Sequence, residues 1–261
     1  IQAIENGADK IRINPGNIGD IERIEKVVKK AKEYEIPIRI GVNSGSLEKE
    51  IIRKYNGVTP EGLAESAVNQ VEVFEKMDFE NIIISLKSSN VKMNYDAHKL
   101  IADKVIYPLH IGITESGTKN SGKIKSAIGI GALLLEGIGD TIRVSLTGDP
   151  VEEIYVAKEI LRAAGVRKGG IDIVACPTCG RCSVNLEEIA AKIEDAVKIL
   201  NKDMTIAIMG CEVNGPGEAK EADLGIAFGK DKALLFKKGQ IVASLRKEEA
   251  EETLIREIEN Y

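Results

Sequence analysis

The four cysteines of the chain lie in its last third and form the clearest group of chemically reactive residues. Three of them follow a C-x2-C-x2-C spacing at Cys176, Cys179 and Cys182, and the fourth is Cys211. An iron–sulfur cluster uses thiolates from one clustered loop together with a distant residue, and this spacing offers both. On spacing alone, Cys182 would be the fourth ligand. The pattern therefore favours an iron–sulfur cluster.

Other uses of the cysteines fit less well. A zinc ribbon needs a second C-x2-C pair, and Cys211 stands alone. A thioredoxin-type CPTC motif leaves Cys182 and Cys211 without a role. Disulfides are disfavoured because three cysteines lie within seven residues in a chain that otherwise looks intracellular. Four ordinary buried cysteines are the remaining alternative.

Polar and cationic residues recur at the ends of short β-branched runs in the first two thirds of the chain. Strand alternation places them on common faces. The residues concerned are Arg12 and Asn14; Arg39 and Asn43; Lys87; and Arg143 and Ser145. If the strands form one sheet or barrel, these four cations come together at one end of it and need a partner of opposite charge. The planar guanidinium group of arginine is well suited to bind phosphate oxygens. We expect a small ligand with several negative charges, unless each cation pairs with a carboxylate of a neighbouring loop.

Two further residue types in this region are less specific. Glu115 also lies at a strand end, where it could transfer a proton or hold an arginine in place. His98 and His110 are the two histidines of the chain, too few for a histidine-based metal site, and we interpret both as structural. The glycines of AIGIGALLLEGIGD, residues 127–140, form only a weak nucleotide fingerprint, and close helix packing explains them better.

Strands alternate with amphipathic helices along residues 1–166, which predicts a parallel sheet. Thr59-Pro60 and Asp149-Pro150 mark two helix starts, and Asp20 a third. An open doubly wound sheet competes with a (β/α)8 barrel. Five units occupy this region, and eight units of that length would give the usual barrel size of about 250 residues. We favour the last five units of a TIM-type barrel and interpret the chain as a fragment that lacks upstream units.

Residues 167–261 predict a second, small α+β domain. The runs IDIVA and TIAIMG read as strands, and each leads into a cysteine, Cys176 or Cys211. Three more short strands follow, and Ala250, Leu254 and Ile258 form one face of a closing helix. Adjacent strand ends would bring the cysteines together.

Composition limits the remaining possibilities. The chain has 261 residues with 36 basic and 41 acidic side chains, a formal net charge of -5. This balance argues against general nucleic-acid binding. No apolar run is long enough to span a bilayer. Localisation rests on the chemistry, which indicates the cytoplasm.

The motifs CPTCGR and GCEVNGPGEA, behind HIGITESGTKNSGKIKSAIGIG and EGIGDTIRVSL, resemble one family. It is the 4-hydroxy-3-methylbut-2-enyl diphosphate synthase family of the methylerythritol phosphate isoprenoid pathway, and the similarity covers essentially the whole chain. The resemblance implies a substrate-binding barrel domain followed by a [4Fe-4S] domain similar to those of sulfite reductases. It also implies a homodimer and flavodoxin or ferredoxin as electron donor.

The resemblance assigns roles to particular residues. Cys176, Cys179 and Cys211 would hold three irons and Glu218 the fourth, while Cys182 departs from the family pattern. Glu115 would act as acid or base. Arg12, Asn14, Arg39, Asn43, Lys87, Arg143 and Ser145 would bind 2-C-methyl-D-erythritol 2,4-cyclodiphosphate. Rival hypotheses are an electron-transfer protein with an all-cysteine cluster and a zinc-dependent binding module.

Overall fold

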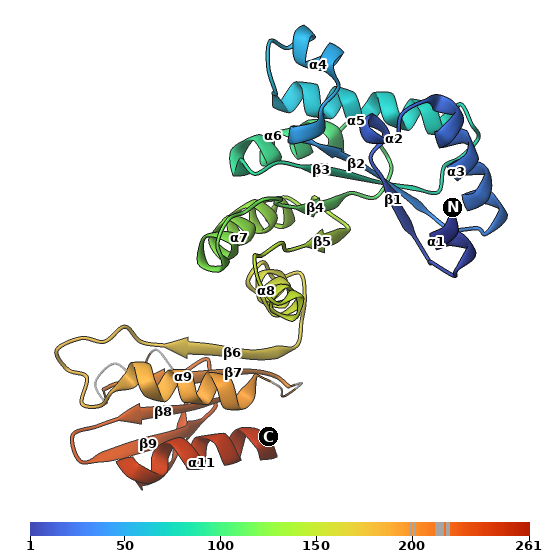
Figure 1. Cartoon of the computed structure of the whole chain (residues 1–261). Helices are drawn as coiled ribbons and strands as arrows, with labels where there is room; N and C mark the ends of the chain where they lie inside the picture. The colour runs from blue at the N-terminus through green and yellow to red at the C-terminus, as the bar shows by residue number, and fades with distance from the viewer. Residues whose placement is uncertain (199, 201, 212–216, 218–219) are drawn as a thin grey trace. The chain divides into compact units, whose positions relative to one another are not determined.

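The computed structural model describes residues 1–198, 200, 202–211, 217 and 220–261. They form two compact units, Ile1–Arg167 (unit 1) and Lys168–Tyr261 (unit 2). Figure 1 shows the elements of each unit. Each unit has its own buried apolar core.

Unit 1 contains five parallel strands that follow one another in sequence order. They are β1 (Ile11–Ile13), β2 (Ile38–Asn43), β3 (Ile82–Lys87), β4 (His110–Gly112) and β5 (Thr141–Arg143). Strands β1, β2 and β3 form one sheet, and β4 and β5 form another. A parallel bridge between Ile84 and Leu109 joins the two sheets. The α/β class with parallel strands is thus confirmed, and these five strands do not close into a barrel among the described residues.

Helices connect these strands. The longer ones are α3 (Ile21–Glu33), α5 (Pro60–Glu75), α6 (Val91–Ala102), α7 (Lys119–Leu135) and α8 (Pro150–Ala163). Short helical turns complete the unit: α1 (Gln2–Glu5), α2 (Pro15–Ile18), η1 (Ser44–Ser46) and α4 (Lys49–Lys54).

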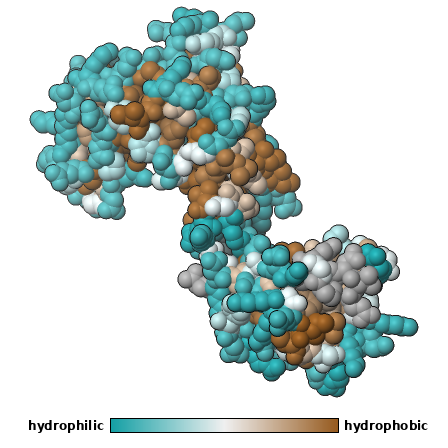
Figure 2. Space-filling view, turned by 180° about the vertical axis from the view of Figure 1, so that it is seen from behind, coloured by the Kyte–Doolittle hydropathy of each residue, from teal (hydrophilic) through white to brown (hydrophobic). Residues whose placement is uncertain are grey.

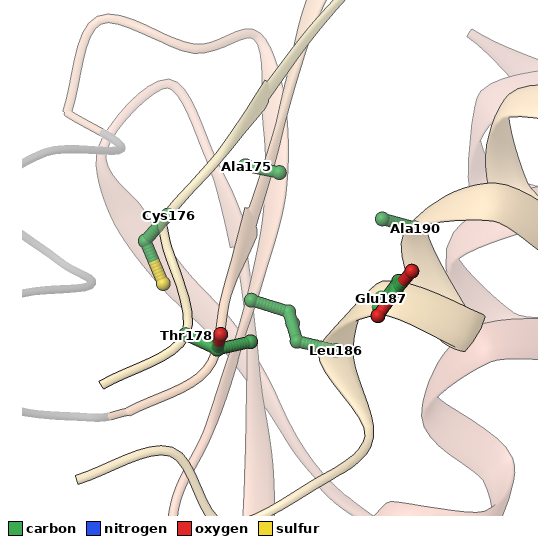
Figure 3. A pocket seen from close by; sticks show the side chains of 6 residues that line it. All are labelled: Ala175, Cys176, Thr178, Leu186, Glu187 and Ala190. Atoms are coloured by element: carbon green, nitrogen blue, oxygen red, sulfur yellow. The ribbon is translucent and has the colours of Figure 1, made fainter. Parts of the chain in front are cut away.

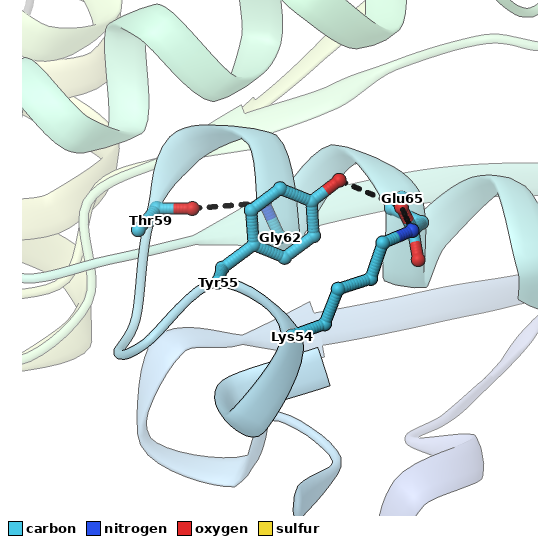
Figure 4. Close-up of polar contacts among 5 residues, drawn as sticks. All are labelled: Lys54, Tyr55, Thr59, Gly62 and Glu65. Atoms are coloured by element: carbon cyan, nitrogen blue, oxygen red, sulfur yellow. Dashed lines mark hydrogen bonds and ion pairs between the residues drawn. The ribbon is translucent and has the colours of Figure 1, made fainter. Parts of the chain in front are cut away.

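Side-chain caps explain where two of the helices begin. The Thr59 hydroxyl accepts a hydrogen bond from the Gly62 amide at 3.1 Å, and Asp149 accepts one from Val151. Asp20 occupies the corresponding position before α3, but its side chain makes no capping bond. Figure 4 shows the Thr59 cap beside Glu65, which pairs with Lys54 and Tyr55 and thereby ties α4 to α5.

α7 carries Gly129 and Gly131, the G-x-G of the weak nucleotide motif, inside its helix, so that pair does not form a phosphate-binding turn. A Cβ on Gly129 would lie 2.5 Å from the Ile113 side chain, which confirms close packing there. At Gly131 a Cβ would meet nothing within 4 Å, so packing does not explain this glycine. Hydrophobic residues reach the surface of unit 1 (Figure 2), and on α7 they include Ile124, Ile128 and Leu135.

In its described residues, unit 2 has a mixed sheet in the order β10-β9-β8-β7-β6 and two helices, α9 and α11. Its strands are β6 (Gly170–Ala175), β7 (Asp203–Met209), β8 (Leu224–Phe228), β9 (Lys232–Lys237) and β10 (Gln240–Arg246), and its helices are α9 (Leu186–Val197) and α11 (Lys247–Asn260). The predicted face of α11, formed by Ala250, Leu254 and Ile258, is fully buried. No helix in the described ranges combines the length and the hydropathy needed to cross a membrane.

Candidate active site

Four cationic side chains of unit 1 come from four of its strands: Lys87 and Arg143 end β3 and β5, Arg12 is the middle residue of β1, and Arg39 is the second residue of β2. Parallel pairing sets Arg12 opposite Arg39, and Asn43 opposite Lys87. Arg143 enters from β5, opposite Gly112 of β4. The sequence-predicted residues of β1, β2, β3 and β5 therefore approach one another, and we call Arg12, Arg39, Lys87 and Arg143 the cation cluster.

The pKa values of the cation cluster show that its charges act on each other. Burial lowers the pKa of Arg39, and the charges of Arg12 and Arg143 lower it further. Burial and then repulsion from Arg39, Arg143 and Arg12 lower the pKa of Lys87 to about 8, against the weaker opposing effect of Glu153. Within the described ranges, no hydrogen-bonded carboxylate offsets these effects on Arg39 or Lys87. The cluster is thus a site of net positive charge that Glu153 offsets only in part, which favours an anionic ligand.

A glycine makes room for one of these cations. The Arg12 guanidinium lies across β2, where a Cβ on Gly41 would approach it to 2.4 Å. Its Nη2 donates a hydrogen bond to Asn43 Oδ1 at 3.3 Å. Asn14 Nδ2 donates to Ser46 Oγ at 2.7 Å, so the two predicted asparagines contact elements at the end of β2.

The loops after β4 and β5 are tied together beside the cation cluster. Ser116 Oγ donates to the Ser145 carbonyl, and Thr147 Oγ1 donates to the Gly117 carbonyl at 3.2 Å. Glu115 precedes this contact, is exposed, and has a φ of 51°. A non-glycine residue in the left-handed region is uncommon, so the loop holds Glu115 in a costly conformation.

The sequence suggests a structural role for His110 and does not show which charges surround it; it is the first residue of β4. The ring is 5% exposed. Burial and then the charges of Arg39, Lys87, Lys10 and Arg143 lower its pKa to about 3. The available signal was alternation, since His110 shares a face of β4 with Gly112, which lies opposite Arg143.

The cysteines of unit 2 follow two neighbouring parallel strands. β6 pairs with β7 so that Ala175 lies opposite Ile208, and Cys176 and Cys211 follow at these adjacent ends. The Gly210 amide donates a hydrogen bond to Cys176 Sγ at 3.2 Å. Cys211 is buried and Cys179 is exposed.

Cys182, the residue outside the family pattern, lies against the same glycine. Its thiol donates to the Val184 carbonyl at 3.3 Å, and a Cβ on Gly210 would approach its sulfur to 2.5 Å. Cys176 and Cys182 thus contact the backbone just before Cys211.

A small cavity of about 240 Å³ opens beside Cys176. Figure 3 shows Cys176 and Thr178 on one side and Leu186, Glu187 and Ala190, at the start of α9, on the other. Glu218, the predicted fourth ligand, lies outside the described residues.

The cysteines fit an iron–sulfur cluster in donor chemistry, because thiolates on two adjacent strand ends are its usual ligands. In the described part of unit 2, no three cysteine, histidine or carboxylate side chains gather closely enough to hold one metal ion.

Comparison with known proteins identifies the relatives of this chain. A family model described as "GcpE TIM-barrel domain" matches residues 1–158, and one described as "GcpE protein C-terminal domain" matches residues 172–260. The chain belongs to the GcpE family. The boundary between the two GcpE matches falls where unit 1 passes into unit 2.

Curated relatives are more than half identical to this chain over the aligned residues. A protein of Caldanaerobacter subterraneus subsp. tengcongensis is 58% identical over 259 residues, which cover 99% of this chain and 73% of the relative. A protein of Clostridium acetobutylicum is 57% identical over 260 residues, covering 100% and 74%. Both relatives are named 4-hydroxy-3-methylbut-2-en-1-yl diphosphate synthase (flavodoxin).

Proposed function

We propose that this chain reduces 2-C-methyl-D-erythritol 2,4-cyclodiphosphate to 4-hydroxy-3-methylbut-2-enyl diphosphate in isoprenoid biosynthesis. The reaction takes up two electrons and two protons and releases one water. The observation that carries the proposal is the cation cluster, in which the charges of the arginines and burial outweigh the attraction of Glu153 for Lys87, in a chain that matches GcpE family models over residues 1–158 and 172–260. A cyclic diphosphate supplies the missing negative charge.

The side chains at the strand ends bind and orient this substrate. Arg12, Arg39, Lys87 and Arg143 bind the phosphate oxygens, because guanidinium and ammonium groups donate several charge-assisted hydrogen bonds to them. Asn14, Asn43 and Ser145 bind the remaining polar groups. The carboxylate of Glu115, presented by the strained turn after β4, donates or accepts a proton at the ring.

The cysteine loops of unit 2 supply the redox part of the proposed site. Cys176, Cys179 and Cys211, with Glu218, would hold a [4Fe-4S] cluster. When bound, such a cluster delivers electrons one at a time. The hydrogen bond from Gly210 to Cys176 would tune its potential, since hydrogen bonds to the sulfurs do so.

The proposal also covers the electron donor, the oligomeric state and the roles of the two domains. Flavodoxin, printed in the names of the relatives, or ferredoxin donates the electrons, and the protein acts as a cytoplasmic homodimer. The five parallel strands of unit 1 are the last five of a TIM-type barrel, with residues 1–166 binding substrate and residues 167–261 forming a cluster domain of the sulfite reductase kind.

Turnover by variants of Glu115 tests the proposal. The chain is loaded anaerobically with iron and sulfide and assayed for product with reduced flavodoxin. We expect Glu115→Gln to lower turnover by about 100-fold or more while cyclodiphosphate affinity changes less than about threefold. Glu159→Gln, at an exposed position on α8, is the matched control. An unchanged turnover in Glu115→Gln would contradict the assigned role.

One observation favours a second function, electron transfer through an all-cysteine cluster. The sulfur of Cys182 lies against Gly210, next to Cys211, where a fourth thiolate could bind iron. Cys182→Ser would then abolish iron and sulfide binding while Glu218→Ala leaves it unchanged. The enzyme proposal predicts the reverse pattern, and metal analysis that finds zinc without sulfide would contradict both.

A further inference from the structure

Two buried polar atoms near the cation cluster have no partner. They are Nε of Arg39 and Nε2 of His110. Buried polar groups without a partner cost free energy, so most are bonded to protein, water or ligand. Both atoms belong to a region where the proposed function places a substrate, which makes a ligand atom the natural partner.

Strand register puts the His110 ring at the level of the cation cluster. Gly41 pairs with Ser85, and the bridge from Ile84 to Leu109 continues this level to His110 on β4. β5 follows with Thr141, whose Oγ1 lies 2.8 Å from His110 Nδ1. Gly41 and Ser85 have small side chains, and the Arg12 guanidinium lies over Gly41, so the imidazole and this guanidinium are the large groups at this level.

The charges around the ring select its hydrogen-bonding form. Burial, and then positive neighbours led by Arg39 and Lys87, lower the pKa of His110 to about 3, so the ring is neutral at physiological pH. A neutral imidazole has one protonated nitrogen and one lone pair. Nδ1 bonds to Thr141, and positive charge favours a lone pair on the other nitrogen. Nε2 of His110 is therefore an acceptor.

The second histidine does not share this arrangement. His98 also has an unpaired Nε2. It lies on α6, however, and its Nδ1 bonds to the Asn94 carbonyl at 2.7 Å. The pKa of His98 is lowered mainly by burial and, among the charges of the described residues, by Lys87 and not by Arg39. The charge of Arg39 therefore acts on the ring of His110 and not on the ring of His98.

The two orphaned atoms require different things of a ligand. Arg39 Nε carries a hydrogen and needs an acceptor, while His110 Nε2 needs a donor. Ionised phosphate oxygens only accept, so they satisfy Arg39 and not His110. A hydroxyl oxygen both accepts and donates. It is the group that meets both requirements.

We propose that His110 and Arg39 form a hydroxyl subsite that binds a free hydroxyl group of the substrate and thereby distinguishes it from other diphosphates. This inference rests on the proposed function, and it deepens that function by assigning a specificity role to His110. The 2,4-cyclodiphosphate esterifies two of the four oxygens of methylerythritol, which leaves two hydroxyl groups available. The cations bind the diphosphate, and His110 Nε2 accepts the hydrogen of one hydroxyl.

A pair of substitutions isolates the acceptor at Nε2. Asparagine can reproduce the contact of Nδ1 with Thr141 but has no atom at the Nε2 position. Glutamine places its amide oxygen near that position. The affinities of wild type, His110→Asn and His110→Gln are measured by isothermal titration calorimetry on the whole chain. The ligands are 2-C-methyl-D-erythritol 2,4-cyclodiphosphate and inorganic pyrophosphate, which has the charge without the polyol.

We expect His110→Asn to bind the cyclodiphosphate about tenfold more weakly and pyrophosphate within about twofold of wild type. His110→Gln should bind both ligands within about threefold of wild type. A bound water in place of the hydroxyl would make both ligands respond equally, and that result overturns the proposal. So does an unchanged cyclodiphosphate affinity in His110→Asn, or a loss in His110→Gln that equals it.

The affinities of the wild-type chain distinguish a failure of the proposed function from a failure of the hydroxyl subsite alone. If wild type binds pyrophosphate but not the cyclodiphosphate, both the proposed function and the hydroxyl subsite are wrong. If wild type binds the cyclodiphosphate and the two histidine variants do not differ, only the hydroxyl subsite is wrong. Pyrophosphate binding in each variant shows that the cation cluster is intact.

Discussion

Replacing Lys87 by methionine should stabilise the ligand-free protein while it removes anion binding. Lys87 is 8% exposed, and its pKa falls from 10.5 to about 8 in the folded chain. At about 1.4 kcal/mol per pKa unit, holding this charge costs the folded state about 3 kcal/mol at pH 7. Methionine fills a similar volume without the charge. We therefore expect the free energy of unfolding to rise by up to about 3 kcal/mol.

The pH dependence of this gain identifies its cause. Between pH 8 and 10.5 the unfolded chain holds the Lys87 proton and the folded chain has released it, so wild-type stability rises with pH. The cost of the charge applies in full below pH 8 and falls to less than about 1 kcal/mol at pH 10. The gain from Lys87→Met should shrink accordingly between pH 7 and pH 10.

Urea denaturation of wild type and Lys87→Met at both pH values provides the assay. Lys92→Met is the matched control, because Lys92 is exposed on α6 and pairs with Asp96 four residues on. It should change the free energy of unfolding by less than about 0.5 kcal/mol. The reasoning is refuted if Lys87→Met is less stable than wild type at pH 7. An equal gain at pH 7 and pH 10 would also refute it, since packing rather than charge would then be responsible.

Further substitutions test individual contacts. Arg39→Ala should weaken cyclodiphosphate binding by about tenfold or more while iron and sulfide content stay unchanged, and an equal loss of both would indicate a structural role. Gly41→Ala should displace the Arg12 guanidinium, because the added Cβ would approach it to 2.4 Å. Calorimetry should then show weaker pyrophosphate binding. An unchanged affinity would show that Arg12 does not bind the anion. Gly210→Ala should lower the free energy of unfolding by about 1–3 kcal/mol through its clash with the Cys182 sulfur, and adding Cys182→Ala should restore most of it. A double variant no more stable than Gly210→Ala would contradict this contact.

Much of the architecture of unit 1 follows from local patterns in the sequence. β-branched runs predict the strands, and parallel pairing then brings Arg39 beside Arg12 without further information. Side-chain hydroxyls and Pro predict where α5 begins, as the Thr59 contact confirms. These features depend on residues close in sequence or on one face of a strand, so pattern suffices.

Features that depend on the surroundings of one residue could not be predicted. His110 reads as an ordinary strand residue, and only three-dimensional packing shows which charges face it. Gly129 and Gly131 look alike in sequence, but a Cβ on the first would clash with Ile113, whereas a Cβ on the second would meet nothing within 4 Å. Asp20 stands at a helix start without capping it, because the cap requires a side-chain rotamer that composition does not fix.

The cysteine region also contains features that the sequence predicts and features that it does not. Strand pairing between β6 and β7 explains why Cys176 and Cys211 follow neighbouring strand ends, and alternating apolar runs predict it. The contact of Cys182 with Gly210 depends on the path of the intervening loop, which spacing does not determine. The assignment of Glu218 remains a prediction from the family resemblance.

Proton uptake on binding tests the central claim most directly, because it reports whether a diphosphate neutralises the cation cluster. The cyclodiphosphate is titrated into the chain at pH 8 in two buffers with different ionisation enthalpies, and the heats are compared. Lys87 is then about half protonated, and a bound dianion raises its pKa, so we expect uptake of about half a proton per chain. Binding without proton uptake, or no binding at all, would contradict the account.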